Sequence, residues 1–290
     1  MFEGFEQVRV TSGGVEINAV HGGAGPPVLL LHGYPQTHAM WDRVAANLAE
    51  SFTVVAADLR GYGDSSKPEG NPEHATYSKR AMAGDQAEVM RSLGFETFAV
   101  VGHDRGARVG HRMALDYPER VIRLAALDIV PTRHIFETAG KELATVYYHW
   151  FFLIQPADFP ECLIGADPMY YLRRTLGRYG ADTSIFDPEA MAEYERCFAD
   201  PRTIHASCED YRAAATIDLV HDEEDRGRKL ACPLFLLWGA RGAMHGLYDV
   251  EAVWREYAED VRGKPLEAGH YLAEERPEDT ARELLAFLES

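Results

Sequence analysis

The segment VGHDRGARVGHRMA, residues 101–114, places an aspartate between two glycines at the end of an apolar run. Gly102, Asp104 and Gly106 fit a G-x-nucleophile-x-G turn, in which the glycines keep side chains out of a sharp strand-to-helix bend and the central side chain stands exposed. An apolar run, TFAVVGHD, precedes the turn, and ARVGHRMALDYP continues after it with helical spacing. We therefore predict that Asp104 is a nucleophile carried on such a turn. The alternative is a helix N-cap, a position that favours aspartate.

An aspartate at this position selects a different reaction from a serine. A serine that attacked a saturated carbon would form an ether, which water cannot cleave at a useful rate. A carboxylate that attacks a saturated carbon forms an ester, and water can then attack the carbonyl group of that ester. Asp104 therefore indicates substitution at an sp³ carbon, as in the cleavage of a carbon–halogen bond or the opening of an epoxide.

Two arginines follow the aspartate in the first turn of the expected helix. The helix macrodipole favours acidic side chains in the first turn and disfavours positive ones. Arg105 and Arg108 therefore depart from the local preference, and a departure beside a candidate nucleophile usually marks function. They lie three residues apart on one helical face, and each guanidinium group can grip a carboxylate with two hydrogen bonds. We predict that they hold a substrate carboxylate with its α-carbon facing Asp104. The alternative is a pair of surface arginines bonded to local acids.

The elements that would position these residues form an α/β pattern, in which apolar β-branched runs alternate with longer helical patterns. Residues 6–20 are expected to form an antiparallel hairpin that turns at Gly13–Gly14. Between 133 and 225 the strands give way to aromatic-rich helical patterns, so we predict a core of 1–132 and 226–290 with a helical cap, 133–225, inserted into it. The expected core strands are 27–33, 52–65, 97–104, 123–131 and 233–239, and the expected core helices are 38–49, 77–93, 105–116 and 272–289.

Taken together, the motifs resemble the α/β-hydrolase fold and, within it, the fluoroacetate (haloacetate) dehalogenases. The resemblance implies a mostly parallel central sheet with flanking helices and an inserted helical cap, hydrolytic dehalogenation of a small haloacid, and a homodimer. We expect no cofactor and no metal. The matching segments span essentially the whole chain: LLHGYPQTHAMW (30–41), DLRGYGDSSKP (58–68), GHDRGARVGHR (102–112), LDIVPT (127–132), YHW (148–150), CEDYRA (208–213) and AGHYLAEERPE (268–278).

By this resemblance, Asp104 is the nucleophile, His270 the general base and Asp128 the acid that orients the base. His270 follows the last strand-like stretch in a Gly-His turn and stands last in the order nucleophile, acid, histidine. Many relatives carry the acid after the WG strand, but the run WGARG, residues 238–242, has no acid at its fifth position. Asp128, at the end of the preceding core strand, is the natural replacement. Asp249 is the second candidate, although its position also suits a helix N-cap.

Further site residues are expected in the HGYP turn and in the cap. The backbone N–H groups of Tyr34 and Arg105 would form an oxyanion hole for hydrolysis of the Asp104 ester. The resemblance implies that His149, Trp150 and Tyr211 receive the leaving halide, because each offers an N–H or O–H donor. From the residues alone, aromatic side chains in YYHWFF are more often part of a core.

The composition of the 290-residue chain excludes several other classes of protein. Its net charge of −17 argues against binding to nucleic acid or to an anionic membrane. We find no secretory signal and no apolar run near the roughly 18 residues of a membrane span. The four cysteines have no CxxC or metal-site spacing, which favours a reduced cytoplasmic protein without disulfides.

Three functions compete on these observations. In a haloacetate dehalogenase, Asp104 would displace the halide and His270 would activate water to release glycolate. An epoxide hydrolase would need two cap tyrosines, or a tyrosine and a histidine, to protonate the oxirane oxygen, and Tyr147, Tyr148 and Tyr211 leave that open. Arg105 and Arg108 would be out of place beside an uncharged epoxide. A small-molecule receptor without catalytic activity would have no need of a complete Asp/His/Asp set. The sequence leaves open which halogen is preferred.

Overall fold

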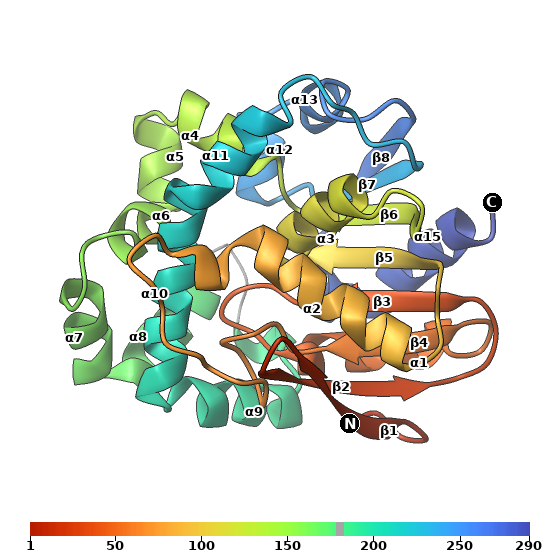
Figure 1. Cartoon of the computed structure of the whole chain (residues 1–290), viewed down its shortest axis with the longest axis horizontal. Coiled ribbons are helices and arrows are strands. Elements are labelled where there is room, and N and C mark those ends of the chain that lie inside the picture. The colour runs from red at the N-terminus through yellow and green to blue at the C-terminus, as the bar shows by residue number, and fades with distance from the viewer. Residues whose placement is uncertain (178–182) are drawn as a thin grey trace.

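Eight strands form one twisted sheet in the order β1-β2-β4-β3-β5-β6-β7-β8 (Figure 1). The computed structural model describes residues 1–177 and 183–290. β1 pairs with β2 and β2 with β4 in antiparallel fashion, while the remaining neighbours run parallel. The strands are β1 (Glu6–Ser12), β2 (Val15–Gly22), β3 (Pro27–Leu31), β4 (Thr53–Ala57), β5 (Phe98–His103), β6 (Val121–Leu127), β7 (Leu234–Gly239) and β8 (Val261–Leu266).

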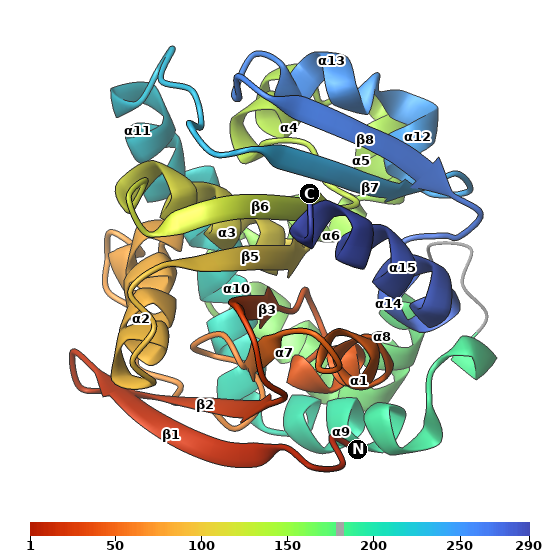
Figure 2. The same ribbon diagram turned by 90° about the vertical axis from the view of Figure 1, so that its right-hand side faces the viewer.

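Helices cover both faces of the sheet, which explains the near-continuous apolar runs of its central strands. Every residue of β5 and β7 is buried. α2 and α3 lie on one face, and α1 and α15 lie on the other (Figures 1 and 2). The helices of the sheet domain are η1 (His38–Trp41), α1 (Asp42–Leu48), η2 (Ala75–Tyr77), α2 (Lys79–Ser92), α3 (Arg105–Asp116), α12 (Ala243–Leu247), α13 (Val250–Trp254), α14 (Leu272–Glu275) and α15 (Pro277–Leu288).

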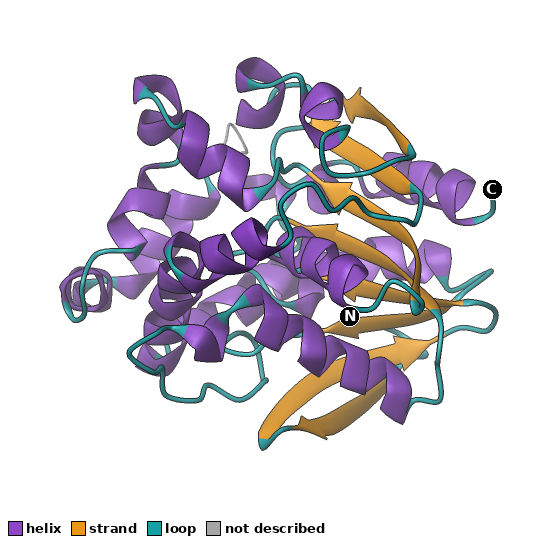
Figure 3. Cartoon of the chain, turned by 45° about the horizontal axis from the view of Figure 1, so that its top comes forward, coloured by secondary structure: helices purple, strands orange, loops and turns teal. Residues whose placement is uncertain are grey.

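A layer of helices separates β6 from β7 in the sequence and packs beyond the carboxyl ends of the parallel strands (Figures 1 and 3). The edge of the sheet where those strands end is where open α/β sheets place their ligands. These elements are α4 (Thr132–Thr138), α5 (Lys141–Val146), α6 (Tyr148–Leu153), α7 (Phe159–Ala166), α8 (Pro168–Leu176), η3 (Thr183–Ile185), α9 (Pro188–Phe198), α10 (Pro201–Ala215) and α11 (Ile217–Glu224). Within the described ranges, no helix is long and apolar enough to cross a membrane.

The expected α/β-hydrolase architecture is confirmed, with differences at the ends of some elements. The hairpin turns at Gly13 and Gly14, which both have positive φ. The helix expected over 272–289 is divided into α14 and α15 because Pro277 begins a new helix at its first turn. The strand expected over 52–65 ends at Ala57, and the glycine-rich segment after it is a loop.

Candidate active site

Asp104 lies at the turn between β5 and α3 with a backbone φ of +45°. This left-handed region is uncommon for a residue with a side chain and often marks a functional position. The flanking glycines are required by close packing. A Cβ on Gly102 would lie 2.5 Å from the backbone of Ala107, and one on Gly106 would lie 2.3 Å from the carbonyl oxygen of Leu31. The turn therefore brings α3 close to the sheet and leaves Asp104 at its tip.

The carboxylate of Asp104 is buried and has two distinguishable oxygens. The backbone N–H of Tyr34 donates to Oδ2 at 3.0 Å. Burial opposes ionisation of Asp104, but the nearby charges of His270, Arg108 and Arg105 outweigh it and hold its pKa below the ordinary value. Asp104 is therefore an anion at neutral pH, with Oδ2 held by the backbone N–H of Tyr34.

His270 and Asp128 form a hydrogen-bonded pair beside Asp104. The Nδ1 atom of His270 lies 2.6 Å from Oδ2 of Asp128, while Oδ1 of Asp128 accepts the backbone N–H of Gly239 at 3.0 Å. Burial lowers the pKa of His270, but the hydrogen bond and charge of Asp128 and the charge of Asp104 outweigh it, so the pKa lies above the ordinary value. The contact with Asp128 therefore fixes the orientation of the His270 ring and favours its protonated form.

His103, which precedes Asp104 in the sequence, contacts the backbone and the ring of His270. Its Nε2 atom bonds to the backbone carbonyl oxygen of His270 at 2.8 Å, and the two rings lie 4.6 Å apart. Burial lowers the pKa of His103 to about 3, so its ring is neutral and donates to that carbonyl. This contact gives His103 a structural role, in which it holds the backbone of His270 in place.

Asp249, the second candidate for the acid, occupies a different environment. Its side chain accepts the backbone N–H of Ala252 at 3.0 Å and caps α13 at an exposed position. The contact with His270 is made by Asp128.

This geometry predicts different effects for two matched substitutions. Asp128→Asn should slow hydrolysis of an ester on Asp104 by roughly 10²–10⁴-fold, because a general base loses its orientation and its counter-charge. The alkylation step should change much less, since it needs no base. Rapid-quench measurement of both steps checks the result, with Asp249→Asn as the control. Damage from Asp249→Asn combined with a harmless Asp128→Asn would show that the acid is wrongly assigned.

Arg105 and Arg108 are both buried, so neither is a surface arginine. Arg105 donates from Nε and Nη2 to the carboxylate of Asp210 at 2.9 and 2.6 Å. Arg108 donates from Nη1 to the carbonyl oxygen of Val130 at 2.9 Å and to Oγ1 of Thr132 at 3.1 Å. Nη1 of Arg105 and Nε of Arg108 have no hydrogen-bond partner among the described residues. These two N–H donors therefore remain for a ligand that binds beside Asp104.

The cap residues expected to receive a halide lie against the two arginines. The guanidinium carbon of Arg105 is 4.2 Å from the ring centroid of Tyr211, and that of Arg108 is 4.5 Å from the Trp150 ring. The Tyr211 ring lies 5.7 Å from that of His149 and 5.8 Å from that of Trp150. Tyr211 also contacts Tyr34, with ring centroids 5.3 Å apart. The structure thus brings α6 and α10 close to the turn that carries Asp104.

Tyr147 and Tyr148 are the other two phenols that the sequence suggests as proton donors, and both rings lie near His149. Tyr147 is buried with its ring 5.5 Å from His149. Burial and the charges of Asp128 and Asp104 raise its pKa well above the ordinary value, so it keeps its proton. The ring of Tyr148 lies 6.1 Å from that of His149 and stacks on that of Phe152 at 6.5 Å.

Sequence reasoning missed Asp210, Lys79 and Tyr62, which surround Arg105. Asp210 accepts the hydroxyl of Tyr62 at 2.7 Å and also contacts the ammonium group of Lys79. Asp210 belongs to the CEDYRA segment, directly before Tyr211, but its partners are more than 100 positions earlier. The sequence signal that could have revealed Asp210 is an acid on the buried face of a predicted helix, because a buried charge needs a partner.

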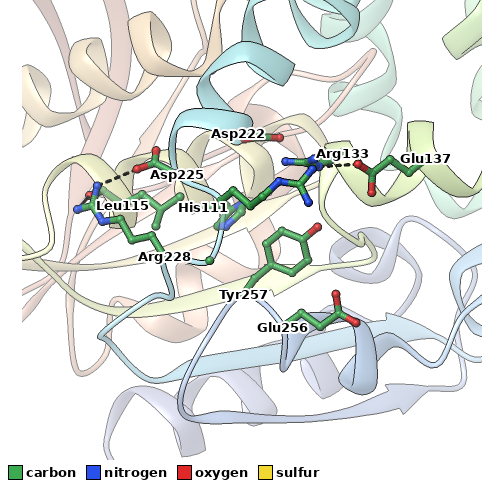
Figure 4. A pocket seen from close by; sticks show the side chains of 11 residues that line it. His111, Leu115, Arg133, Glu137, Asp222, Asp225, Arg228, Glu256 and Tyr257 are labelled. Atoms are coloured by element: carbon green, nitrogen blue, oxygen red, sulfur yellow. Dashed lines mark hydrogen bonds and ion pairs between the residues drawn. The ribbon is translucent and has the colours of Figure 1, made fainter.

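A separate hollow of about 240 Å³ opens beyond α3 (Figure 4). His111, one turn after Arg108, lines it with Arg133, Asp222 and Tyr257, and none of the residues expected to act on a substrate does. Over residues 1–177 and 183–290, no group of three or more His, Cys, Asp or Glu side chains could hold a metal ion. All four cysteines are free.

Fold and site together define an α/β hydrolase that carries an aspartate at the turn between β5 and α3. A family model of the alpha/beta hydrolase fold matches residues 26–277. The crystal structure of a proposed α/β hydrolase from Nostoc sp PCC 7120 is 59% identical over 99% of both chains, with a TM-score of 0.98. The chain belongs to the α/β-hydrolase family.

Within that family, the chain belongs with the haloacetate dehalogenases. It is 53% identical to a fluoroacetate dehalogenase of Burkholderia sp, over 99% of this chain and 95% of the relative. It is 36% identical to a soluble epoxide hydrolase of Corynebacterium sp, over 95% of each chain. The chain is therefore an enzyme of the hydrolase class.

Proposed function

We propose that this enzyme hydrolyses haloacetates to glycolate and halide through an ester on Asp104. The observation that carries the proposal is the pair of buried guanidinium groups, Arg105 and Arg108, directly behind an ionised Asp104. A neutral substrate would leave their donors unused. The 53% identity to a fluoroacetate dehalogenase supports the same reaction.

In the first step, Arg105 and Arg108 bind the substrate carboxylate and direct its α-carbon toward Asp104. An electron pair of Oδ1 forms the C–O bond while the carbon–halogen bond breaks, and the halide leaves with the bonding pair. His149, Trp150 and Tyr211 donate to the departing anion, so the cap formed by α4–α11 contributes directly to this step. The result is a carboxymethyl ester and a halide ion.

In the second step, His270 removes a proton from water, and the resulting hydroxide attacks the Cγ atom of Asp104. The N–H groups of Tyr34 and Arg105 stabilise the oxyanion. Tyr34 already bonds Oδ2, which is the oxygen that becomes negative. As the intermediate collapses, the imidazolium of His270 gives its proton to the departing Oδ1, and glycolate is released. The carboxyl group left on Asp104, which now carries one oxygen from water, loses its proton to solvent and is a carboxylate again. Asp128 stabilises the imidazolium until its proton leaves.

Epoxide hydrolysis is the second candidate, because Tyr147 and Tyr211 lie near Asp104 and an epoxide hydrolase is 36% identical. One assay separates the two reactions: halide release from fluoroacetate and chloroacetate, measured beside diol formation from styrene oxide. We expect halide release without diol formation. Diol formation without halide release would refute the proposal.

The cap donors should matter most for the poorest leaving group. Fluoride concentrates negative charge in the smallest volume, so loss of one transition-state donor should slow fluoroacetate by roughly 10²–10³-fold. Tyr211→Phe deletes one hydroxyl and little shape, and we expect a much smaller effect on bromoacetate. Halide release from both substrates measures the difference. Equal losses would mean that Tyr211 shapes the pocket without binding the leaving group.

A further inference from the structure

Asp210 lies at the centre of a buried charge cluster that joins α10 of the cap to the core. It is fully buried and accepts hydrogen bonds from Arg105, Tyr62 and Lys79. Burial opposes its ionisation, but the charges and hydrogen bonds of Arg105 and Lys79 hold its pKa well below the ordinary range. Asp210 is therefore an anion at neutral pH and a built-in counterion for Arg105.

This pairing restricts what Arg105 can offer a substrate. Nε and Nη2 are committed to Asp210, and Nη2 also donates to the Asp210 backbone carbonyl at 2.9 Å. The two-point contact fixes the plane of the guanidinium group, which lies against the Tyr211 ring. Only Nη1 is left without a hydrogen-bond partner in the described part of the chain. Arg105 is thus a fixed donor whose charge is already balanced.

Arg108 differs from Arg105 in its partners. Its hydrogen bonds go to neutral oxygens of Val130 and Thr132, and none of the ion pairs found among the described residues involves it. Burial lowers its pKa to about 10, opposed mainly by the charge of Asp104, so it stays protonated at neutral pH. Esterification of Asp104 would remove that charge. The substrate carboxylate would then be the remaining anion that faces Arg108.

We infer that the two arginines have unequal roles and that Asp210 is a positioning residue that acts through Arg105. Arg108 supplies the charge that attracts the carboxylate, while Arg105, held by Asp210, supplies one oriented N–H group. This inference rests on the proposed function and specifies its substrate class. Once Asp104 is esterified, Arg108 is the one arginine of the pair without an anionic partner among the described residues, which suits a substrate with a single carboxylate.

A double-mutant cycle tests whether Asp210 acts through Arg105. Halide release from chloroacetate and from uncharged chloroacetamide is measured for wild type, Asp210→Asn, Arg105→Met and the double variant. Asp210→Asn should lower kcat/KM for chloroacetate roughly 10- to 100-fold, mainly through KM, and change chloroacetamide much less. In the Arg105→Met background the same change should have an effect below about threefold. Arg108→Met should reduce the preference for the acid further than Arg105→Met does.

Asp218→Asn is the matched control for the loss of a buried acid where the helical cap packs on the core. Asp218 is also buried at the core–cap junction and pairs with the same Lys79, at 3.4 Å, but it does not bond Arg105. The Asp218→Asn variant should leave the ratio of chloroacetate to chloroacetamide activity unchanged. If Asp210→Asn folds poorly, Tyr62→Phe removes one hydrogen bond from Asp210 without changing charge and should lower the ratio by a smaller amount.

Several outcomes would overturn the inference. Equal loss on both substrates, multiplicative losses in the double variant, or an unchanged ratio in Tyr62→Phe would show that Asp210 only stabilises the fold. A wild-type enzyme that releases no halide from chloroacetate would instead refute the proposed function. The two failures are therefore distinguishable in one experiment.

Discussion

Asp104→Asn should lower haloacetate turnover by roughly 10⁴-fold or more, the scale seen when a covalent nucleophile is removed. An uncharged amide is too poor a nucleophile to displace a halide. The substitution keeps the size of the side chain, and the amide oxygen can still accept the Tyr34 N–H that bonds Oδ2. Steady-state halide release measures the effect.

Asp249→Asn is a suitable control, because it makes the same chemical change at an exposed helix cap. It should retain wild-type turnover. The thermal unfolding midpoint of Asp104→Asn shows whether the fold is intact. A folded Asp104→Asn enzyme with turnover within tenfold of wild type would exclude the nucleophile role.

The second large effect is expected from His270→Ala, which should stop the reaction after its first step. Displacement of the halide needs no base, whereas hydrolysis of the ester loses roughly 10²–10⁴-fold without one. The variant should release about one halide per active site and then stall. Mass spectrometry should find the protein heavier by a carboxymethyl group, located on the peptide that contains Asp104.

The double variant Asp104→Asn/His270→Ala provides the control for adventitious alkylation, because four free cysteines are present. It should acquire no adduct under the same conditions. Unmodified His270→Ala protein after a halide burst, or an adduct that persists in the double variant, would contradict the role of His270.

The strand-to-helix turn at Asp104 could be predicted from the sequence because its requirements are local. Gly102 and Gly106 are the residues that allow α3 to approach the sheet, and their spacing around Asp104 is visible in the chain. Asp128 could be predicted because parallel strands end at one edge of the sheet, which brings the ends of β5, β6 and β7 together. The hydrogen bond from Asp128 to His270 follows from that topology.

The environment of Arg105 could not be predicted in the same way. Its spacing from Arg108 indicated a shared helical face, but its counterion lies 105 positions later on a cap helix. Helical periodicity says which side of α10 is buried and says nothing about which core residue it meets. The predicted roles of the two arginines were therefore symmetric, whereas the structure gives them different partners.

The edge strand β8 was also difficult to predict from the sequence. β8 has the sequence VRGKPL, with glycine, lysine and proline and with most side chains at least partly exposed. An edge strand has one unpaired side and little need of apolar residues, so its pattern is weak. In the sequence, β8 could be recognised only as a strand-like stretch that precedes His270.

The central claim, a covalent ester on Asp104, is tested most directly by a single turnover of chloroacetate in ¹⁸O-water with enzyme in excess. Water attacks Cγ of Asp104, so the label should appear in the Asp104 carboxylate, and the first glycolate should carry the original, unlabelled enzyme oxygen. Mass spectrometry of glycolate and of the peptide containing Asp104 reads both positions. Labelled glycolate from the first turnover, with no label in the enzyme, would mean that water attacks the substrate directly and that no ester forms.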